Sequence, residues 1–242
     1  DPAWYRYVSR LFWEYLRMVV PVIPVLLGIL WLKAIPRWRA AQTAAAFYGL
    51  TLPAASLALG GILVALVFAS KWLLLGRVRE GQHPLWSCWC SRWDFLYVIW
   101  ANYVRGSLTS FDGTPFMAWW LRAMGSRIGR RVVLGTSFAQ VVDPDMLEIG
   151  DDATVSCLLQ LHSFEDRVLK IAPSRVGEGC TVGSGAVLLY GATIGDGACV
   201  EDGSVVMKRE TLLPGQYYVG CPTRPALAPG LEFQNATTAV AA

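Results

Sequence analysis

His162 stands in the densest group of ionisable side chains in the chain. It opens the stretch HSFEDRVLK, in which Glu165, Asp166, Arg167 and Lys170 follow closely. An imidazole with a carboxylate neighbour can act as a general base near neutral pH, because the carboxylate orients the ring and stabilises the imidazolium. These residues therefore favour His162 as a catalytic base. Taken alone, they fit a polar loop held by ion pairs about as well.

The remaining histidine and the cysteines do not indicate a metal site. His83 precedes Pro84 and is expected to be a linker residue. The six cysteines form no C-x-x-C pair and have no histidine at zinc spacing, so the sequence predicts neither a disulfide framework nor a bound metal. Reduced thiols of a cytosolic domain are the expected state.

An aliphatic residue returns at every sixth position in the C-terminal half of the chain. The positions are Val176, Val182, Leu188, Ile194, Val200 and Val206. Neither an α-helix nor a flat strand has this period. A six-residue repeat predicts a β-helix, in which each hexad forms one short side, the aliphatic residue points inward and glycine serves the tight corner.

The same pattern extends toward the N-terminus in two further runs that are out of step. The runs begin at Ile128 (with Leu134) and at Ile149 (with Val155 and Leu161). One insertion lies between residues 140 and 148, and a longer one lies between Leu161 and Val176. Insertions in a repeat array form loops at a corner and often line the binding face. We therefore expect His162 to point outward at the root of the second loop.

The N-terminal part is too apolar for an ordinary soluble domain. The chain is 54% hydrophobic, and no charged side chain occurs between Ala40 and Ser70, which is long enough to cross a bilayer. A buried core helix is the alternative. A second span is expected around Met18–Leu32, extended by the preceding LFWEYLR, with a re-entrant or kinked helix through Pro21 and Pro24 as its alternative. Glu14 and Arg17 are spaced to neutralise one another.

Basic residues flank both expected spans. Arg6, Arg10 and Arg17 precede the first span, Lys33, Arg37 and Arg39 lie between the two, and Lys71, Arg77 and Arg79 follow the second. Since both outer flanks would share one side, the positive-inside rule places the termini and the β-helix in the cytoplasm. Anionic lipid headgroups are the expected partner of these cations, and nothing suggests nucleic acid.

The sequence thus predicts a mixed fold with four regions. Residues 1–80 hold two transmembrane α-helices, and residues 81–127 hold linker helices that lie in the membrane interface or pack on the coil. One of these, Pro115–Met124, is expected to be amphipathic. Residues 128–226 form the β-helix with its protruding loop, and residues 227–242 form a loose tail. A chain that opens on Asp1 is expected to be a processed protein or a piece of a longer polypeptide.

Several motifs carry a resemblance to known families. The hexads, the lead-in at Gly113–Gly129 and the exit VGCPTRPA at Val219–Ala226 resemble the left-handed parallel β-helix (hexapeptide-repeat) acyltransferases. More specifically, D-x-D-x-x-x-IGD (Asp143–Asp151) and LQLHSFEDRVLK (Leu159–Lys170), behind paired membrane spans, resemble the C-terminal region of ε-poly-lysine synthetase-type nonribosomal peptide synthetases.

This resemblance implies a module that condenses amino acids. His162 would deprotonate a free amine that attacks an aminoacyl thioester, carried by phosphopantetheine on an upstream carrier domain of the same polypeptide, which would also hold adenylation domains. Asp166 or Glu165 would orient His162 or hold the ammonium group of the substrate. The expected substrate contacts are Asp143 and Asp145, whose charge suits a cationic amino acid such as lysine, together with Gln160 and Arg167.

The resemblance also implies cofactor contacts and an assembly. Arg224, Lys208 and Arg209 are the expected contacts of the pantetheine phosphate, and no metal is expected. Sites in this family form between coils of a trimer or of tandem modules, so this chain would trimerise, pair with neighbouring β-helix modules, or be inactive alone. Two alternatives remain: a membrane-associated O- or N-acetyltransferase that uses coenzyme A, and a non-catalytic β-helix that docks its neighbours.

Overall fold

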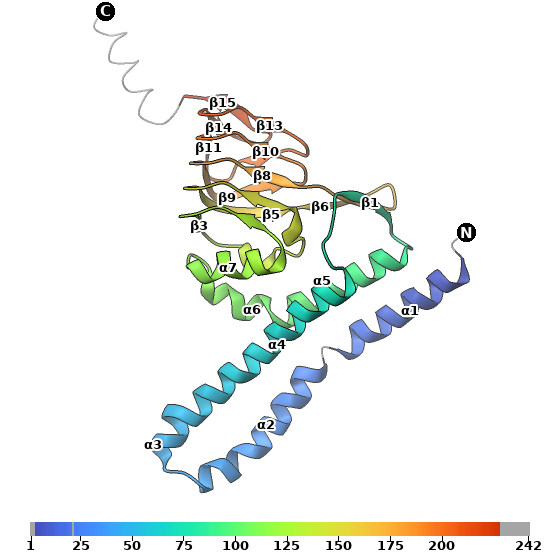
Figure 1. The fold of residues 1–242 in the computed structure, drawn as a ribbon, viewed down its shortest axis with the longest axis vertical. Coiled ribbons are helices and arrows are strands. Elements are labelled where there is room, and N and C mark those ends of the chain that lie inside the picture. The colour runs from blue at the N-terminus through green and yellow to red at the C-terminus, as the bar shows by residue number, and fades with distance from the viewer. Residues whose placement is uncertain (1–2, 21, 228–242) are drawn as a thin grey trace, which may run out of the picture. The chain divides into compact units, whose positions relative to one another are not determined.

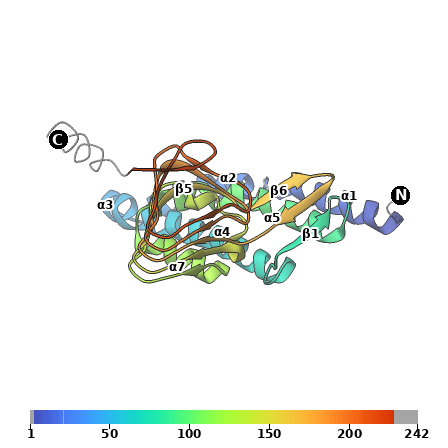
Figure 2. The ribbon, with the colours of Figure 1, turned by 90° about the horizontal axis from the view of Figure 1, so that it is seen from above.

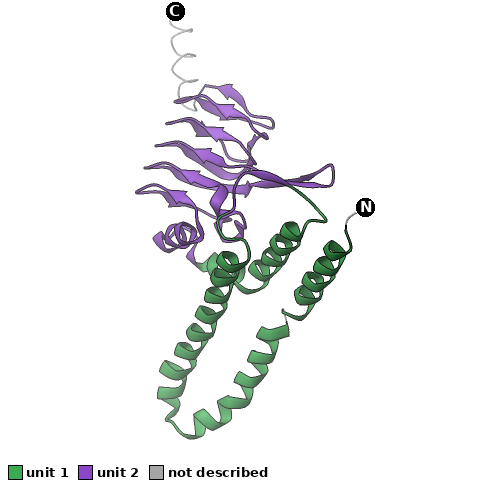
Figure 3. Cartoon of the chain, turned by 45° about the vertical axis from the view of Figure 1, so that its right-hand side comes forward, with its two compact units in different colours: residues 1–77, 83–110 green, residues 78–82, 111–242 purple. Residues whose placement is uncertain are grey.

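The protein divides into two compact units. The computed structural model describes residues 3–20 and 22–227, so Pro21 and all but the first residue of the expected 227–242 tail lie outside the described residues. Unit 1 comprises residues 1–77 and 83–110, and unit 2 comprises residues 78–82 and 111–242 (Figure 3). The region expected as one linker, residues 81–127, is therefore shared between the two units.

Unit 1 is helical. Its elements are α1 (Trp4–Val19), α2 (Val22–Ala40), α3 (Ala44–Ala46), the π-helical η1 (Phe47–Thr51), α4 (Leu52–Leu74), α5 (Cys88–Tyr103) and α6 (Arg105–Leu108). The helical stretches Trp4–Ala40 and Ala44–Leu74 are long and apolar enough to cross a membrane. Only length and composition support this, so the two spans stay a prediction.

Helix α1 extends the first apolar run and also contacts α5. Glu14 lies 2.6 Å from Arg10 and 3.3 Å from Arg17, which confirms the predicted Glu14 and Arg17 pair. Asp94 on α5 contacts the same two arginines at 3.1 and 2.8 Å. Helix α1 ends at Val19, and α2 begins at Val22. Asp94 lies in a segment of the chain far from α1. The sequence around α1 therefore did not reveal its contacts with the two arginines.

Helix α5 is a packed helix within unit 1. Trp93 and Trp100 are 2% and 1% exposed, and six more of its residues are buried. Tryptophans that anchor a helix at the headgroups of a bilayer would instead lie on its outer face. The observed burial shows a packed helix, but its packing partners are helices of unit 1 and not the coil named in the expected alternative.

Unit 2 is a parallel β-helix preceded by a short helix, α7 (Pro115–Met124), which matches the expected amphipathic segment. One sheet contains β2 (Arg127–Ile128), β4 (Leu147–Ile149), β8 (Ser174–Val176), β10 (Thr193–Ile194) and β13 (Thr211–Leu212). The other contains β3 (Val133–Leu134), β5 (Thr154–Gln160), β9 (Thr181–Leu189), β11 (Cys199–Val200), β12 (Val205–Val206), β14 (Tyr217–Val219) and an antiparallel β15 (Arg224–Ala226). Figures 1 and 2 show the coils stacked one on another.

The strand register confirms the six-residue repeat. Val176, Ile194 and Leu212 are partners in neighbouring coils, and they follow one another at intervals of 18 residues, or three hexads a coil. Val182 and Val200 are paired in the same way in the second sheet. All five side chains are almost fully buried, so the aliphatic position of each hexad forms the core. The left-handed sense of the coil stays a prediction.

Both predicted insertions are present, and each has secondary structure. The first holds the 3-10 helix η4 (Pro144–Met146) and directly follows the 3-10 helix η3 (Phe138–Gln140). The second, expected as a loop, is an antiparallel hairpin of β6 (His162–Glu165) and β7 (Val168–Ile171) that projects from the coils (Figure 2). Strand β1 (Gly81–Pro84) joins it in the sheet order β1-β7-β6. Backbone pairing of this kind gives the insertion a defined geometry.

Glycine has two distinct roles in the coils. Gly185 adopts a φ of 70° at a corner, whereas Gly183 is needed because the next coil approaches closely. A Cβ at Gly183 would lie 2.2 Å from Asp202 Oδ1 and 2.6 Å from Asp202 N. Since a backbone atom cannot move aside as a flexible side chain can, the position tolerates no methyl group.

We therefore expect Gly183→Ala to destabilise the β-helix by about 1–3 kcal/mol, the usual cost of overpacking. The measurement is the thermal unfolding midpoint of the chain in detergent. Gly106→Ala is the matched control, because nothing lies within 4 Å of a Cβ added there. Equal midpoints for the two variants would contradict the close approach of the coils.

Candidate active site

His162 is bonded to a buried carboxylate from the other insertion. His162 Nδ1 lies 2.6 Å from Asp143 Oδ2, and the exposed fractions of the two side chains are 19% and 1%. His162 begins β6 at the root of the hairpin, and Asp143 precedes η4. Each of the two insertions in the hexad pattern therefore supplies one residue of a His–Asp pair.

This geometry suits a general base. A carboxylate that accepts a hydrogen bond from Nδ1–H holds the imidazole in the tautomer whose Nε2 can take a proton, and it stabilises the imidazolium that results. A carboxylate as buried as Asp143 is costly unless it is paired and hydrogen-bonded. The short separation is typical of a charge-assisted hydrogen bond. The pair thus combines a rigid acceptor with a ring that is partly open to solvent.

The turn that carries Asp143 is fixed on both sides. Asp145 Oδ2 accepts a hydrogen bond of 3.1 Å from the backbone N–H of Val78, and Ser126 Oγ donates one of 2.7 Å to the carbonyl of Pro144. Asp145, expected to attract a cationic substrate, therefore also binds the segment of residues 78–82. These contacts hold the backbone on which the orientation of Asp143 depends.

Glu165 and Asp166 are engaged elsewhere, which differs from the expectation that one of them orients His162. Glu165 accepts hydrogen bonds from Lys208, Lys170 (2.9 Å) and Ser163 (3.0 Å). Asp166 is 89% exposed, with its carboxylate 3.6 Å from Lys170. Side chains alternate along a strand, so His162 and Glu165, three residues apart, lie on opposite faces of β6.

The Lys208 ammonium, followed by that of Lys170 and the Ser163 hydroxyl, lowers the pKa of Glu165 to about 2. A carboxylate with a lowered folded-state pKa stabilises the protein above its ordinary pKa, and this contribution is lost as the pH falls through the folded-state value. We expect wild type to be more stable than Glu165→Gln at pH 6, with the difference shrinking between pH 4.5 and about 2. Thermal unfolding of both proteins across this range measures it. A difference that does not change with pH would contradict the ion cluster.

The other expected site residues are spread over unit 2. Gln160 ends β5, Arg167 lies in the β6–β7 turn with a φ of 62°, and Arg224 is exposed in β15. Lys208 reaches the hairpin through Glu165, and Arg209 lies 3.5 Å from Glu80. The structure therefore brings together His162 with Asp143, and Lys208 with Glu165. The sequence singled out Asp143 through its D-x-D motif, but not for the role of partner to His162.

The remaining histidine is structural, and the described residues contain no metal-binding group. His83 stacks on Trp89 with ring centroids 3.7 Å apart, and burial lowers the pKa of its imidazole. Among the residues that the structure describes, no three His, Cys, Asp or Glu side chains are placed to hold a metal ion.

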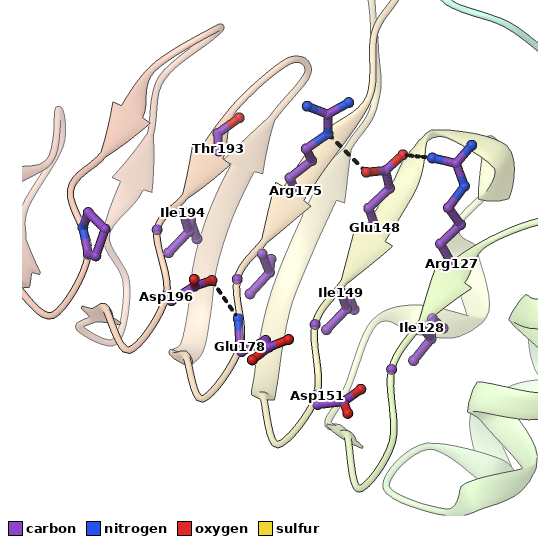
Figure 4. A pocket seen from close by; sticks show the side chains of 16 residues that line it. Arg127, Ile128, Glu148, Ile149, Asp151, Arg175, Glu178, Thr193, Ile194 and Asp196 are labelled. Atoms are coloured by element: carbon purple, nitrogen blue, oxygen red, sulfur yellow. Dashed lines mark hydrogen bonds and ion pairs between the residues drawn. The ribbon is translucent and has the colours of Figure 1, made fainter.

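A shallow groove runs across the sheet of β2, β4, β8 and β10, with a volume of about 650 Å³. Glu148 accepts hydrogen bonds from Arg127 and, at 2.9 Å, from Arg175 (Figure 4). At the neighbouring corner Asp196 Oδ1 accepts one of 2.9 Å from the backbone N–H of Glu178. These bonds link successive coils. In the described part of the chain, none of the expected site residues lines this groove.

The hexad region matches a known family. A sequence model of the family described as bacterial transferase hexapeptide (six repeats) matches residues 173–208. The match is limited to this stretch of the chain. The matched residues span β8 to β12, where the repeat has no insertions. The expected resemblance to hexapeptide-repeat acyltransferases is thereby confirmed.

A curated relative extends the likeness beyond the hexapeptide repeat. The delta-poly-L-ornithine synthetase of Acinetobacter baumannii (strain AB307-0294) is 29% identical over 167 residues, which is 68% of this chain and 12% of that protein. The chain therefore spans a small part of its relative's length.

Two solved structures show a weaker likeness to part of this chain. A hexapeptide-repeat acetyltransferase from Vibrio cholerae is 15% identical, with a TM-score of 0.37, covering 51% of this chain and 87% of that one. An N-acyltransferase from Bacillus cereus, solved with dTDP and 3-hydroxybutyryl-CoA, is 20% identical, with a TM-score of 0.31, covering 39% of this chain and 59% of that one.

Proposed function

We propose that the β-helix forms amide bonds, transferring an aminoacyl group from a thioester to the amine of an amino acid or of a short polymer of it. The observation that carries this proposal is the hydrogen bond of 2.6 Å between His162 and the buried Asp143. It lies within a chain that carries the hexapeptide repeat and resembles a poly-amino-acid synthetase.

The reaction needs one base and produces one thiol. The amine nitrogen attacks the thioester carbonyl carbon, the C–N bond forms, and the C–S bond breaks as the thiolate leaves. His162 Nε2 takes the proton that the attacking nitrogen loses and returns it to the departing sulfur. Asp143 stabilises the imidazolium between these two steps. No redox partner is required, and protons and electrons balance.

The donor in this proposal is an aminoacyl thioester on the phosphopantetheine of a carrier domain. That carrier, and the adenylation domain that loads it, would belong to the same polypeptide. The name of the relative, a synthetase of poly-ornithine, supports a donor made by activating an amino acid. A coenzyme A thioester is the alternative donor, because it presents the same pantetheine thiol. Neighbouring β-helix modules would complete a trimer or an equivalent arrangement.

The helical unit would anchor this chemistry in a membrane. The two apolar stretches, Trp4–Ala40 and Ala44–Leu74, would provide two spans, with the β-helix on the cytoplasmic side. Basic residues at their ends would contact anionic headgroups. Such an anchor would hold the β-helix close to the carrier domain and to the growing polymer.

The proposed function is tested by measuring two products of the full-length protein in one reaction with ATP and an amino acid: the aminoacyl thioester on the carrier and the amide polymer. A condensing β-helix acts only after loading, so a disrupted site should leave the thioester to accumulate. Acetyl transfer from added acetyl coenzyme A, without polymer, would support an acetyltransferase instead. If polymer forms without the β-helix, the β-helix would have a docking role and not a catalytic one.

A further inference from the structure

Arg209 occupies a backbone position that glycine fills in the neighbouring hexads. The corner glycines with positive φ are Gly179, Gly185, Gly191, Gly197, Gly203 and Gly215, which follow one another every six residues except where Arg209 intervenes, with a φ of 58°. The left-handed region is unfavourable for a side chain with a Cβ, and arginine is not one of the residues that tolerate it well. Strain of this kind persists where the surroundings hold it, and it concentrates at functional sites.

The surroundings of Arg209 fit its side chain. Its backbone N–H donates a hydrogen bond of 3.1 Å to the carbonyl of Tyr190, and its guanidinium lies 5.9 Å from the centre of the Tyr190 ring. The side chain passes over Gly191, where an added Cβ would lie 2.9 Å from Arg209 Cγ. The preceding coil thus leaves room for an arginine at this corner.

Arg209 faces a small cavity of about 210 Å³ whose lining is mostly polar. The lining residues are Glu80, Ala172, Pro173, Arg175, Gly191, Thr193 and Arg209. Arg209 and Glu80 are loosely paired at 3.5 Å, with side chains 62% and 54% exposed. Arg175 is bonded to Glu148 through Nε, and its terminal nitrogens point away from Glu148 (Figure 4). The lining of the cavity therefore includes two arginines and one glutamate.

We propose that this cavity binds the α-carboxylate and α-ammonium groups of an amino acid. Guanidinium groups match the planar geometry of a carboxylate, so Arg209 and Arg175 would take the carboxylate, and Glu80 would take the ammonium. The volume is below the roughly 300–1,000 Å³ typical of sites for larger ligands. The carboxylate of Glu80 also disfavours a phosphate dianion, the group first expected at Arg209.

The cavity adjoins the proposed catalytic base through the backbone. The N–H of Ala172, in the cavity wall, donates a hydrogen bond of 3.4 Å to the carbonyl of Leu161, the residue before His162. His162 and Ile171 are direct partners in the hairpin. The inference rests on the proposed function for its substrate class: the cavity would select an amino acid by its zwitterionic end.

The test measures binding to the 242-residue chain in detergent, without a thioester donor, by isothermal titration calorimetry. The probes are L-ornithine, 1,4-diaminobutane, which lacks only the carboxylate of ornithine, and coenzyme A. We expect ornithine to bind the wild type at least tenfold more tightly than the diamine. Arg209→Gly, which gives this corner the glycine of the neighbouring hexads, should weaken ornithine binding by about 10- to 100-fold, the value of charged hydrogen bonds.

The control is Arg131→Gly, which also replaces an arginine of positive φ, here 53°, but one paired with Asp152 away from the cavity. It should bind ornithine as the wild type does. Because glycine relieves backbone strain, Arg209→Gly should unfold at no lower temperature than the wild type, which separates lost binding from lost folding.

Three results would overturn the inference: no ornithine binding by the wild type, equal binding of ornithine and the diamine, or an Arg209→Gly variant that loses affinity for coenzyme A and not for ornithine. The last result would assign Arg209 to a phosphate. None of these results depends on amide formation. Failure of the proposed function would show instead as polymer synthesis that continues without His162.

Discussion

His162→Ala is expected to lower the rate of amide formation by about 10²- to 10⁴-fold, the usual contribution of a positioned general base. Loading of the carrier thioester should be unchanged, because it precedes the step in which His162 acts. The physical reason is that the attacking amine must lose a proton, and Asp143 holds the ring for that transfer at 2.6 Å. The measurement is polymer formation against thioester occupancy in the full-length protein.

The chain supplies a matched control for this substitution. His83 is the other histidine, and it stacks on Trp89 in unit 1, outside the β-helix. His83→Ala removes the same side chain and should leave amide formation within about twofold of the wild type. Polymer formation at the wild-type rate by His162→Ala would contradict the assignment of His162 as the general base. The coil would then act as a scaffold.

Asp143→Asn is expected to lower amide formation by about 10²-fold or more, while the thermal midpoint changes little. The substitution keeps the shape of a buried side chain, but it replaces a pure acceptor with an amide that can donate to His162 Nδ1. The ring would then carry its proton on Nε2 and could not accept another there. The loss should fall on kcat rather than on KM, since a misplaced proton affects the transfer and not amine binding.

A comparison of Asp143→Asn with Asp166→Asn decides which carboxylate orients His162. The resemblance to polymer synthetases suggested Asp166 or Glu165, whereas the structure has Asp143 at the imidazole and Asp166 exposed in the hairpin turn. On the observed geometry, Asp143→Asn should be much more damaging than Asp166→Asn. The reverse ranking, with a normal kcat for Asp143→Asn, would refute the His162 and Asp143 pairing.

Most of the architecture of the β-helix could be predicted from the sequence. The hexad positions Val176, Ile194 and Leu212 are partners in the observed register, and both insertions interrupt the coils where the aliphatic pattern slips. A repeat in which each unit packs only on its neighbours carries its geometry in its period, so local sequence suffices. The prediction that His162 lies at the root of the second insertion follows from the same register.

The partner of His162 was decided by the tertiary structure. Glu165 and Asp166 are close to His162 in sequence, but strand alternation turns Glu165 to the opposite face and leaves Asp166 in the turn. Asp143 lies 19 residues away, on an insertion whose backbone is fixed by Val78 and Ser126. Stacking of coils brings such segments together, and no period within one segment records which residues will meet.

The sequence by itself therefore determined the repeat, its core and the chemistry available at His162. Only the tertiary structure decided that α1 shares its charges with Asp94, that the second insertion pairs as a hairpin with β1, and that Arg209 replaces a corner glycine beside Glu80. Periodic burial is a local property of a chain, because it depends on residues a few positions apart. Contacts between polar side chains from distant segments depend on how those segments pack, and packing is a property of the whole fold.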